Sequence, residues 1–541
     1  MTYLKKNRGL FSGMLLAIIG FTCSCELKQE LEKPNIIYIM SDDHTSQAIG
    51  AYGGRLASLN PTPNIDKLAK EGMMFENVFC TNAICTPSRA TILTGQYSQA
   101  NGVLDLSGSL PAERQYLPQA MKEAGYQTAM IGKWHLEAEP AAFDYYQVLP
   151  VQGKYFNPSF RIRGEKQWPK NTVSYEGHSS DVITDLTLEW LKEKRDKNKP
   201  FFLMHHFKAP HDFFEFAPRY AKYLEDVEIP EPTSLYNQGN HGSIATRGEN
   251  DSLIHIIGSS ISKRNINRDM GKDLKVDQSL EGDAYTKASY QEYLKRYLRC
   301  VKGVDDNIKR LMDYLEKEDL LDNTIIIYTG DQGMMLGEHD YQDKRWMYEE
   351  SMRMPFIVRY PQMIKAGQRT DALVNNTDFA PTMISLAKGN IPEQMHGKSF
   401  ECILTTGKEP EDWRTATYYR YWMHMAHKHA NPAHFGIRTK QYKLIFFYAK
   451  HYDPDNHKKE WGANYYFESP VGWELYDLAK DPNEMNNVYG QEEYAAITQD
   501  LKEQLLALRA QYNEGDEQYP EIQKVIEENW DTVKMEEVAF K

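Results

Sequence analysis

Four short apolar runs, each followed directly by a polar cluster, constrain the fold of this chain more than any other feature. The runs are residues 35–40, 128–131, 201–207 and 324–329. Each is short and bounded by polar residues, so each predicts a buried strand. Patterns with a helical period, at 180–194 and 291–317, lie between these runs and predict crossover helices. We therefore expect an α/β protein with a large, mostly parallel sheet flanked by helices.

The polar clusters carry side chains that could take part in catalysis or metal binding. They read Ser-Asp-Asp-His at 41–44, Gly-Lys-Trp-His at 132–135, Ala-Pro-His at 209–211 and Gly-Asp-Gln-Gly at 330–333. Because parallel strands gather functional groups at their carboxyl ends, we expect these clusters to lie together. Asp42, Asp43, Asp331 and Gln332 offer hard oxygen ligands, which suit Ca²⁺ or Mg²⁺ rather than Zn²⁺. Taken alone, the aspartate pair also fits a helix cap or a solvated turn.

A further signal is a thiol at the start of a predicted helix. Residues 85–95 read Cys-Thr-Pro-Ser-Arg-Ala-Thr-Ile-Leu-Thr-Gly. Pro87 suits the first helical turn, and Gly95 suits the residue just past the end. Cys85 would lie beside free backbone N–H groups, and Arg89 adds a fork-shaped donor for oxyanions. This arrangement is compatible with an activated thiolate, and the alternative is a buried, inert cysteine.

Together these motifs resemble the type I sulfatases of the alkaline-phosphatase-like superfamily. In that family the cysteine of Cys-x-Pro-x-Arg, here Cys85, is oxidised by a maturase to formylglycine. The resemblance implies a large, mostly parallel sheet flanked by helices and a smaller antiparallel C-terminal subdomain. It also implies one divalent cation, usually Ca²⁺, whose ligands would be Asp42, Asp43, Asp331, Gln332 and the formylglycine derived from Cys85. Gln332 departs mildly from the family pattern, in which this position varies.

The resemblance also assigns catalytic roles. Arg89, Lys133 and Lys344 would contact the sulfate, whose sulfur is attacked by the hydrated aldehyde. Lys344 would also contact the bridging oxygen, together with His211, and assist the leaving group. His211 would protonate the departing oxygen, and His135 would take a proton from the hydrate as sulfate leaves. On an extended segment, Lys133 and His135 would share one face. Each of these histidines and lysines, considered singly, also fits a structural role.

The stretch 418–434 concentrates aromatic, histidine and cationic side chains, and we expect it to contact the substrate. Together with 293–306, it looks similar to bacterial glycosaminoglycan sulfatases, especially those that remove 6-O-sulfate from N-acetylglucosamine in heparin or heparan sulfate. The candidate substrate residues are Arg420, His424, His434 and Arg438. The alternative for the stretch is a strand and turn with exposed polar groups.

Two other functions belong to different classes. Phosphonate monoester and phosphodiester hydrolases of the same superfamily share the oxyanion site. The second alternative is a non-catalytic surface lipoprotein that binds glycans. In such a protein we would expect the nucleophile, the base or a metal ligand to be missing. None of these residues is missing from the sequence.

The N-terminus predicts export. Lys5, Lys6 and Arg8 precede an apolar run at 10–21, so residues 1–25 are expected to be a signal peptide. The cysteines at its end resemble a bacterial lipoprotein processing site, with Cys25 as the lipidated residue. The alternative is cleavage to a soluble periplasmic protein. We expect a periplasmic or outer-membrane-anchored protein of a Gram-negative bacterium that contacts the membrane only through that anchor.

The remaining sequence predicts the domain organisation. A break near 405–411 separates a catalytic domain at 34–405 from an antiparallel subdomain at 412–515 and a tail at 516–541. Strands are expected at 416–422, 435–439, 442–448 and 473–477, and a helix at 493–513.

Composition and cysteine usage complete the predictions. The net charge of −13 argues against nucleic acid as a partner, but a local basic pocket for a sulfated saccharide remains compatible with it. Residues 232–284 are expected to form a surface insertion, either a substrate loop or a passive excursion. Cys80 and Cys300 are expected to be buried thiols, outside any disulfide framework.

Overall fold

A ten-stranded sheet forms the centre of the protein. The computed structural model describes residues 33–532, apart from 165, 428 and 454–468. Five neighbouring strands are parallel and follow the order β10 (Thr324–Gly330), β1 (Asn35–Asp42), β8 (Phe201–Pro210), β4 (Gln127–Lys133) and β5 (Tyr145–Leu149). Beyond β10 lie β13 (Phe356–Arg359), β2 (Met73–Phe75) and β14 (Gln368–Thr370), and beyond β5 lie β6 (Ser159–Ile162) and β7 (Thr172–Ser174). All four predicted strands are confirmed, and they lie side by side.

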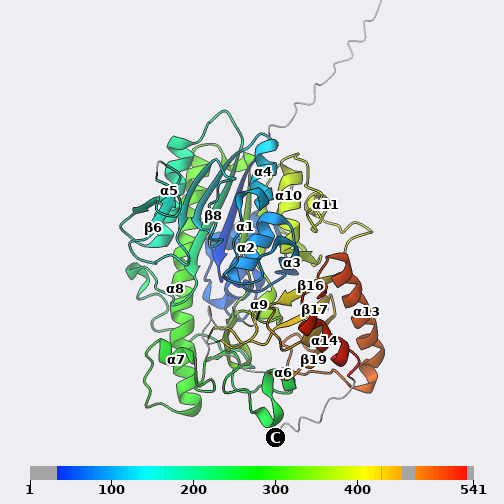
Figure 1. Cartoon of the computed structure of the whole chain (residues 1–541). Helices are drawn as coiled ribbons and strands as arrows, with labels where there is room; N and C mark the ends of the chain where they lie inside the picture. The colour runs from blue at the N-terminus through cyan, green and yellow to red at the C-terminus, as the bar shows by residue number, and fades with distance from the viewer. Residues whose placement is uncertain (1–32, 165, 428, 454–468, 533–541) are drawn as a thin grey trace, which may run out of the picture. The chain divides into compact units, whose positions relative to one another are not determined.

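Helices cover both faces of this sheet because alternate strand residues point to opposite sides. Ile37 and Ile39 of β1 pack into the core that contains α1 (Pro63–Glu71), α5 (Ser179–Glu189) and α8 (Gly282–Lys317). Ile36 and Tyr38 pack into the core that contains α2 (Cys85–Thr94), α4 (Tyr116–Glu123) and α10 (Phe379–Leu386). Figure 1 shows α5 and α8 on one side of the sheet and α4 and α10 on the other. The predicted α/β class is confirmed, although α8 begins earlier than predicted.

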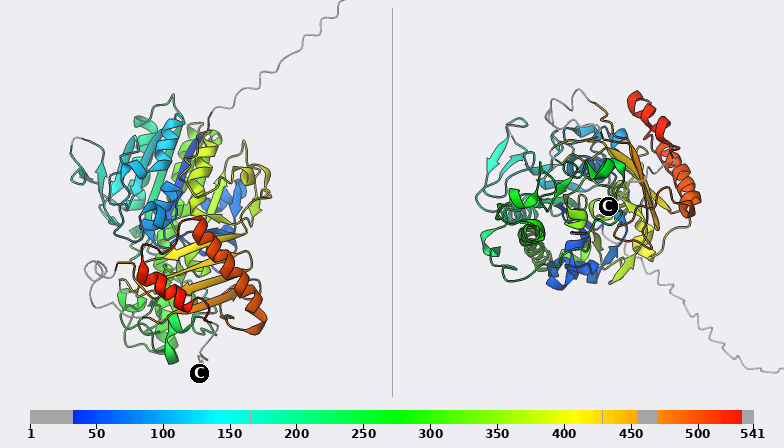
Figure 2. Two further views of the ribbon diagram at one scale, coloured as in Figure 1. Left: turned by 45° about the vertical axis from the view of Figure 1, so that its right-hand side comes forward. Right: turned by 90° about the horizontal axis from the view of Figure 1, so that it is seen from below.

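A second, antiparallel sheet lies in the C-terminal part. Its strands follow the order β16 (Ala416–Tyr421), β17 (His434–Thr439), β18 (Tyr442–Phe447) and β19 (Gly472–Asp477), as predicted. Helix α13 (Ala495–Gln511) packs across the strands, as Figure 2 shows in its left view. A helix that was not predicted, α14 (Pro520–Asn529), adds Ile522 and Ile526 to the same core. The described residues from 34 onward belong to one compact unit.

Residues 232–284 are folded and tied to the rest of the chain. They include α6 (Ile244–Arg247), β9 (Ser259–Ser260) and α7 (Met270–Asp273). Strand β9 pairs with β12 (Tyr341–Asp343), which in turn pairs with β11 (Met335–Leu336). The Ser243 hydroxyl donates to a Glu474 carboxylate oxygen at 3.0 Å. The insertion is therefore an integral part of the packing rather than a passive excursion.

The cysteines of the described residues are free thiols. Cys80 and Cys300 are buried as predicted, and Cys402 is exposed. No helix within the described ranges has the length and apolar character needed to cross a membrane. The predicted signal peptide, residues 1–25 with Cys25, lies outside the described residues.

A buried ion cluster joins the segment after α13 to the antiparallel sheet, and its loss is expected to destabilise the protein. Asp516 pairs with Arg420 at 2.6 Å and also with Arg509, and the Arg420 and Asp516 side chains are each 2% exposed. Arginine stays charged even when buried, so Asp516→Asn removes the carboxylate that pairs with two buried cations. We expect the free energy of unfolding to fall by about 3–5 kcal/mol in urea titrations.

The matched control for this variant is Asp313→Asn. Asp313 accepts from Lys309 at 2.6 Å, but its side chain is 57% exposed. The control should unfold like the wild type, since exposed pairs contribute little. Equal midpoints for all three proteins would contradict the role given to Asp516.

Buried neutral histidines are expected to make the fold acid-labile. Burial lowers the pKa of His205, whose Nδ1 lies 2.8 Å from the Thr187 hydroxyl, to about 3. Between pH 6.5 and 3 the unfolded chain therefore binds a proton that the folded chain does not. Stability is lost as the pH falls through this window, by about 1.4 kcal/mol per pH unit for such a group.

The test compares the wild type with His205→Gln in urea unfolding at several pH values between 4 and 7. The variant should lose stability less steeply on acidification, by about one proton's contribution. If the two proteins lose stability equally steeply as the pH falls, His205 does not contribute to the acid lability.

Candidate active site

The parallel strands bring three aspartates to one edge of the sheet. Asp42 is the last residue of β1, Asp43 follows it, and Asp331 follows the neighbouring strand β10. Each offers one carboxylate oxygen, and these oxygens lie within 4.8 Å of one another. The Asp43 backbone N–H donates to Asp331 Oδ1 at 3.1 Å. The side chains are at most 1% exposed, so this is a buried possible metal site.

The charges around the aspartates fit a divalent cation. Burial and the charge of Asp42 raise the pKa of Asp331 to about 7. Burial would also raise the pKa of Asp42, but the charge of Lys133, aided by other cationic neighbours, holds it well below its usual range. Gln332 donates its amide to Asp43, while its Oε1 is buried without a hydrogen-bond partner in the described part of the chain. Carboxylate and amide oxygens are the ligands that Ca²⁺ and Mg²⁺ prefer, so the residues present fit such an ion.

Cys85 lies at the start of α2, as predicted, and faces this cluster. Its Sγ is 3.5 Å from Asp42 Oδ1, and the residue is 1% exposed. Gly95 ends the helix with a left-handed φ of 64°, which a glycine adopts without strain. Burial, and then the charge of Asp42, raise the pKa of the Cys85 thiol. This opposes the thiolate that the sequence allowed, and it leaves a neutral thiol next to the carboxylates.

Three buried cations offset the three carboxylates. Arg89 donates to Asp331 Oδ2 at 2.8 and 3.1 Å and to the Lys133 carbonyl at 2.8 Å. The Lys133 ammonium bonds Asp42, and the Lys344 ammonium lies 2.6 Å from Asp43 Oδ2. The centre formed by these six groups is therefore close to neutral before any ligand enters. A divalent cation would compete for the carboxylates and release the ammonium groups toward an anion.

His135 follows a turn in the backbone rather than an extended segment. Strand β4 ends at Lys133, and His135 has a φ of 56°, so the predicted extended segment through 135 is wrong. The turn leaves His135 Nδ1 buried and without a partner among the residues that the structure describes. Burial, and then the charges of Lys133 and Arg89, hold the pKa of His135 well below its usual value. The ring is therefore neutral in the folded protein.

His211 lies just past the end of β8. Its Nε2 is 3.8 Å from Asp43 Oδ2, and its Nδ1 is 2.6 Å from Asp212 Oδ1. One of its ring nitrogens lies within 4.8 Å of both Cys85 Sγ and an Asp42 oxygen. The fold thus gathers all the predicted catalytic and metal-binding residues in one buried centre.

The predicted substrate residues are engaged elsewhere. Arg420 pairs with Asp516, as described above, and Arg438 lies 3.2 Å from Glu349. His434 is buried among the rings of Tyr419, Tyr421, Trp346 and Phe447, and burial lowers its pKa to about 4. His424 Nδ1 accepts the Ala433 backbone N–H at 3.2 Å.

The 418–434 stretch nevertheless approaches the site through another residue. His429 Nδ1 lies 3.1 Å from Asp343 Oδ2, directly beside Lys344 in the sequence. His429 is not one of the four substrate candidates, and the role of this region in substrate binding stays a prediction.

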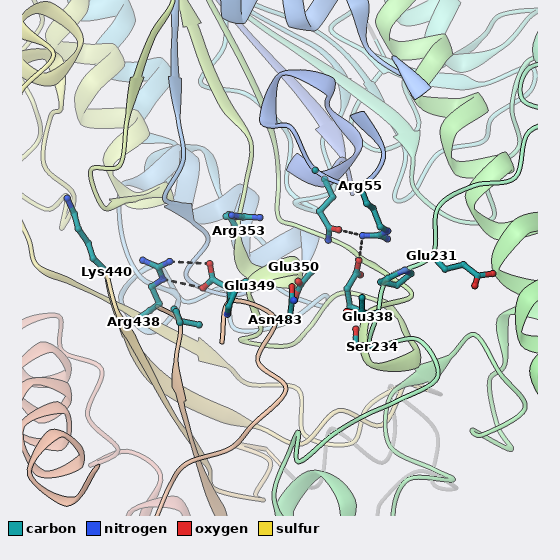
Figure 3. A pocket seen from close by; sticks show the side chains of 16 residues that line it. Arg55, Glu231, Ser234, Glu338, Glu349, Glu350, Arg353, Arg438, Lys440 and Asn483 are labelled. Carbon is teal, nitrogen blue, oxygen red and sulfur yellow. Dashed lines mark hydrogen bonds and ion pairs between the residues drawn. The ribbon is translucent and has the colours of Figure 1, made fainter. Parts of the chain in front are cut away.

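Arg438 lines a separate cavity of about 510 Å³. Figure 3 shows that charged side chains surround it, with Arg438 directed at Glu349 and Arg55 at Glu338. None of the aspartates of the site lines this cavity. Among the described residues, Glu350 Oε2 and Arg353 Nε of this cleft are buried without a hydrogen-bond partner.

Sequence reasoning missed several residues that hold the site in place. Gln152 accepts from the Lys133 ammonium at 2.5 Å, and the Tyr297 hydroxyl donates to the Asp43 carbonyl at 2.7 Å. Asp212 pairs with His211. Only Asp212 carried a usable signal, since it is a carboxylate next to a candidate catalytic histidine. Gln152 lies outside every motif, and Tyr297 lies in the 293–306 stretch but was not singled out within it.

Comparison with known proteins agrees with this geometry. Residues 34–389 match the sulfatase family, and residues 337–461 and 449–511 match the C-terminal region of N-sulphoglucosamine sulphohydrolase. The chain is 39% identical to the N-acetylglucosamine-6-O-sulfatase of Bacteroides thetaiotaomicron, over 95% of this chain and 93% of that protein.

Solved structures give the same picture. The structure of BT4656 in complex with its substrate D-glucosamine-2-N,6-O-disulfate is similar, with a TM-score of 0.77, 38% identity, and coverage of 90% of this chain and 99% of that one. A phosphonate monoester hydrolase from Silicibacter pomeroyi shares the fold, with a TM-score of 0.66 and 20% identity over 89% of this chain and 96% of that one. On the family match and the 39% identity, the chain belongs to the sulfatase family of enzymes.

Proposed function

We propose that this sulfatase hydrolyses the 6-O-sulfate ester of glucosamine-type saccharides derived from glycosaminoglycans such as heparan sulfate. The observation that carries the proposal is the position of Cys85, 3.5 Å from Asp42, a carboxylate that also pairs with Lys133 and Arg89. Support for the sugar comes from the relatives, one named for N-acetylglucosamine-6-O-sulfate and one bound to a glucosamine disulfate. The fold alone does not choose between sulfate and phosphonate, since a phosphonate hydrolase shares it.

Two groups complete the proposed site. A formylglycine made from Cys85 by a maturase would supply a hydrated aldehyde whose hydroxyl attacks sulfur. A calcium ion held by Asp42, Asp43, Asp331, Gln332 and residue 85 would offset negative charge on a sulfate oxygen. The unpartnered Gln332 Oε1 and the close aspartate oxygens support this ligand set.

Side chains of this protein would bind the sulfate and transfer the protons. Arg89, Lys133 and Lys344 would bind the sulfate oxygens and offset the charge that builds on them in the transition state. His211 would donate a proton to the departing sugar oxygen, and neutral His135 would accept the proton that must leave residue 85. A decayed, glycan-binding protein is disfavoured because every one of these groups is present in one buried centre.

The domain organisation and location belong to the same proposal. Residues 34–405 would form the catalytic domain, 412–515 the antiparallel subdomain, and 516–541 a C-terminal extension. We propose export by the N-terminal 25 residues to the periplasm or outer membrane, with lipidation at Cys25 as the anchor. Palmitate labelling of the wild type and of Cys25→Ala tests the anchor, which predicts label only in the wild type.

The substrate is tested by sulfate release from defined saccharides, using protein produced together with a maturase. The panel contains N-acetylglucosamine-6-sulfate, glucosamine-2-N,6-O-disulfate, a 2-N-sulfated glucosamine and a phosphonate monoester. We expect release from the first two only, with the N-sulfate of the second retained. Cleavage of the phosphonate alone would overturn the assignment to sulfate, and release from the 2-N-sulfated sugar would overturn the position.

A further inference from the structure

His211 is held by the residue that follows it. Its Nδ1 lies 2.6 Å from Asp212 Oδ1 and 3.0 Å from the Asp212 carbonyl oxygen. A carboxylate and a carbonyl only accept hydrogen bonds, so Nδ1 must carry the hydrogen. The ring is thereby fixed with its other nitrogen, Nε2, on the side of Asp43 at 3.8 Å. This geometry defines both the tautomer and the direction of the reactive nitrogen.

Asp212 is itself fixed from the 232–284 insertion. Arg268, between β9 and α7, donates from Nη2 to Asp212 Oδ2 at 2.9 Å, and its Nη1 lies 2.6 Å from His429 Nε2. The side chains of Asp212 and Arg268 are 21% and 14% exposed, so the pair is partly shielded from water. Burial would raise the pKa of Asp212, but the charges of His211 and Arg268 outweigh it and keep the carboxyl ionised. The insertion thus reaches the reaction centre through one arginine.

We propose that Asp212, held by Arg268, is a positioning residue that directs the His211 Nε2–H at the leaving oxygen of the sulfate ester. The inference rests on the proposed function and deepens it. As the bond between sulfur and the sugar oxygen breaks, its electron pair stays on that oxygen, which takes the proton from Nε2. His211 is left neutral, with its Nδ1–H still on Asp212.

The expected signature is dependence on the leaving group. A sugar alkoxide leaves poorly without a proton, whereas 4-nitrophenolate leaves well unaided, so only the sugar ester needs an oriented acid. For Asp212→Asn we expect kcat on N-acetylglucosamine-6-sulfate to fall by about 10²–10⁴-fold, with a small change in KM. Turnover of 4-nitrophenyl sulfate should fall far less. Arg268→Lys should shift the ratio of the two rates in the same direction, but by less, since lysine cannot make the same two contacts.

Asp181→Asn is the matched control. Asp181 also pairs with an arginine, Arg219, at 2.7 Å, and its side chain is 23% exposed, close to the value for Asp212. The control should keep the wild-type ratio of the two rates. Retained 4-nitrophenyl sulfate turnover shows that Asp212→Asn is folded and matured, and if that variant does not fold, Arg268→Lys decides.

Three results separate this inference from the proposed function. Equal losses on both esters, or no loss on either, would overturn the role of Asp212 while leaving the sulfatase function intact. If the wild type cleaves simple alkyl sulfates but not the sugar sulfate, the substrate is wrong, and the comparison of alkyl with aryl esters still decides the role. If the matured wild type cleaves no sulfate ester, both proposals fall.

Discussion

Cys85→Ala is expected to reduce sulfate release by roughly 10⁴-fold or more, because alanine has no thiol that could be oxidised to the proposed aldehyde and therefore provides no hydrated aldehyde to attack sulfur. The thiol is buried beside Asp42, and its raised pKa opposes direct attack as a thiolate. Under the proposed function, activity depends on oxidation of this residue. Ion chromatography of released sulfate measures the loss, and mass spectrometry of the peptide that contains residue 85 shows whether the wild type carries the aldehyde.

Cys80→Ala is the control for this prediction. Cys80 is fully buried five positions before Cys85, in the core on the same face of the sheet. Its substitution should lower stability through the lost packing but leave the turnover near that of the wild type. Sulfate release by Cys85→Ala at the wild-type rate would contradict the nucleophile assignment.

Removing the divalent cation is expected to have the second largest effect. Treatment of the matured enzyme with a chelator should lower kcat by more than about 10²-fold, since a preorganised positive charge at the reaction centre is lost. Added Ca²⁺ should restore it. The melting temperature should also fall on chelation, because three buried carboxylates lose the cation that they share.

Asp331→Asn separates a bound ion from a general effect of the chelator. The variant lacks one carboxylate ligand, so its melting temperature should respond less to chelation and to added Ca²⁺ than that of the wild type. It should also lose activity. The same calcium-dependent shift in both proteins would place the ion elsewhere.

The strand runs and the motifs at their ends were predictable because burial on both faces leaves a continuous apolar signal. That signal located Asp42, Lys133, His211 and Asp331, and the topology of the sheet then explains why they meet. The helix at Cys85 was equally readable, since Pro87 and Gly95 mark its ends. For these residues, sequence position and strand order are nearly sufficient to predict where they lie in the fold.

Long-range and side-chain details were not predictable in this way. The positive φ of His135 depends on how the chain leaves β4, and no local pattern records it. Arg420 looked like a ligand because it is cationic and lies among aromatics, yet it is neutralised by Asp516, almost a hundred residues later. Arg268 reaches Asp212 from a segment of weak periodicity. Such pairings between distant charges only become visible once the chain is folded.

The most direct test of the account is sulfate release in ¹⁸O-labelled water by the matured wild type. The substrate is N-acetylglucosamine-6-sulfate, and mass spectrometry follows both products. If an oxygen on residue 85 attacks sulfur, the released sulfate carries a solvent oxygen and the sugar hydroxyl stays unlabelled. Label in the sugar hydroxyl would mean that the bond between carbon and oxygen breaks instead, and it would contradict the mechanism built around Cys85 and Asp42.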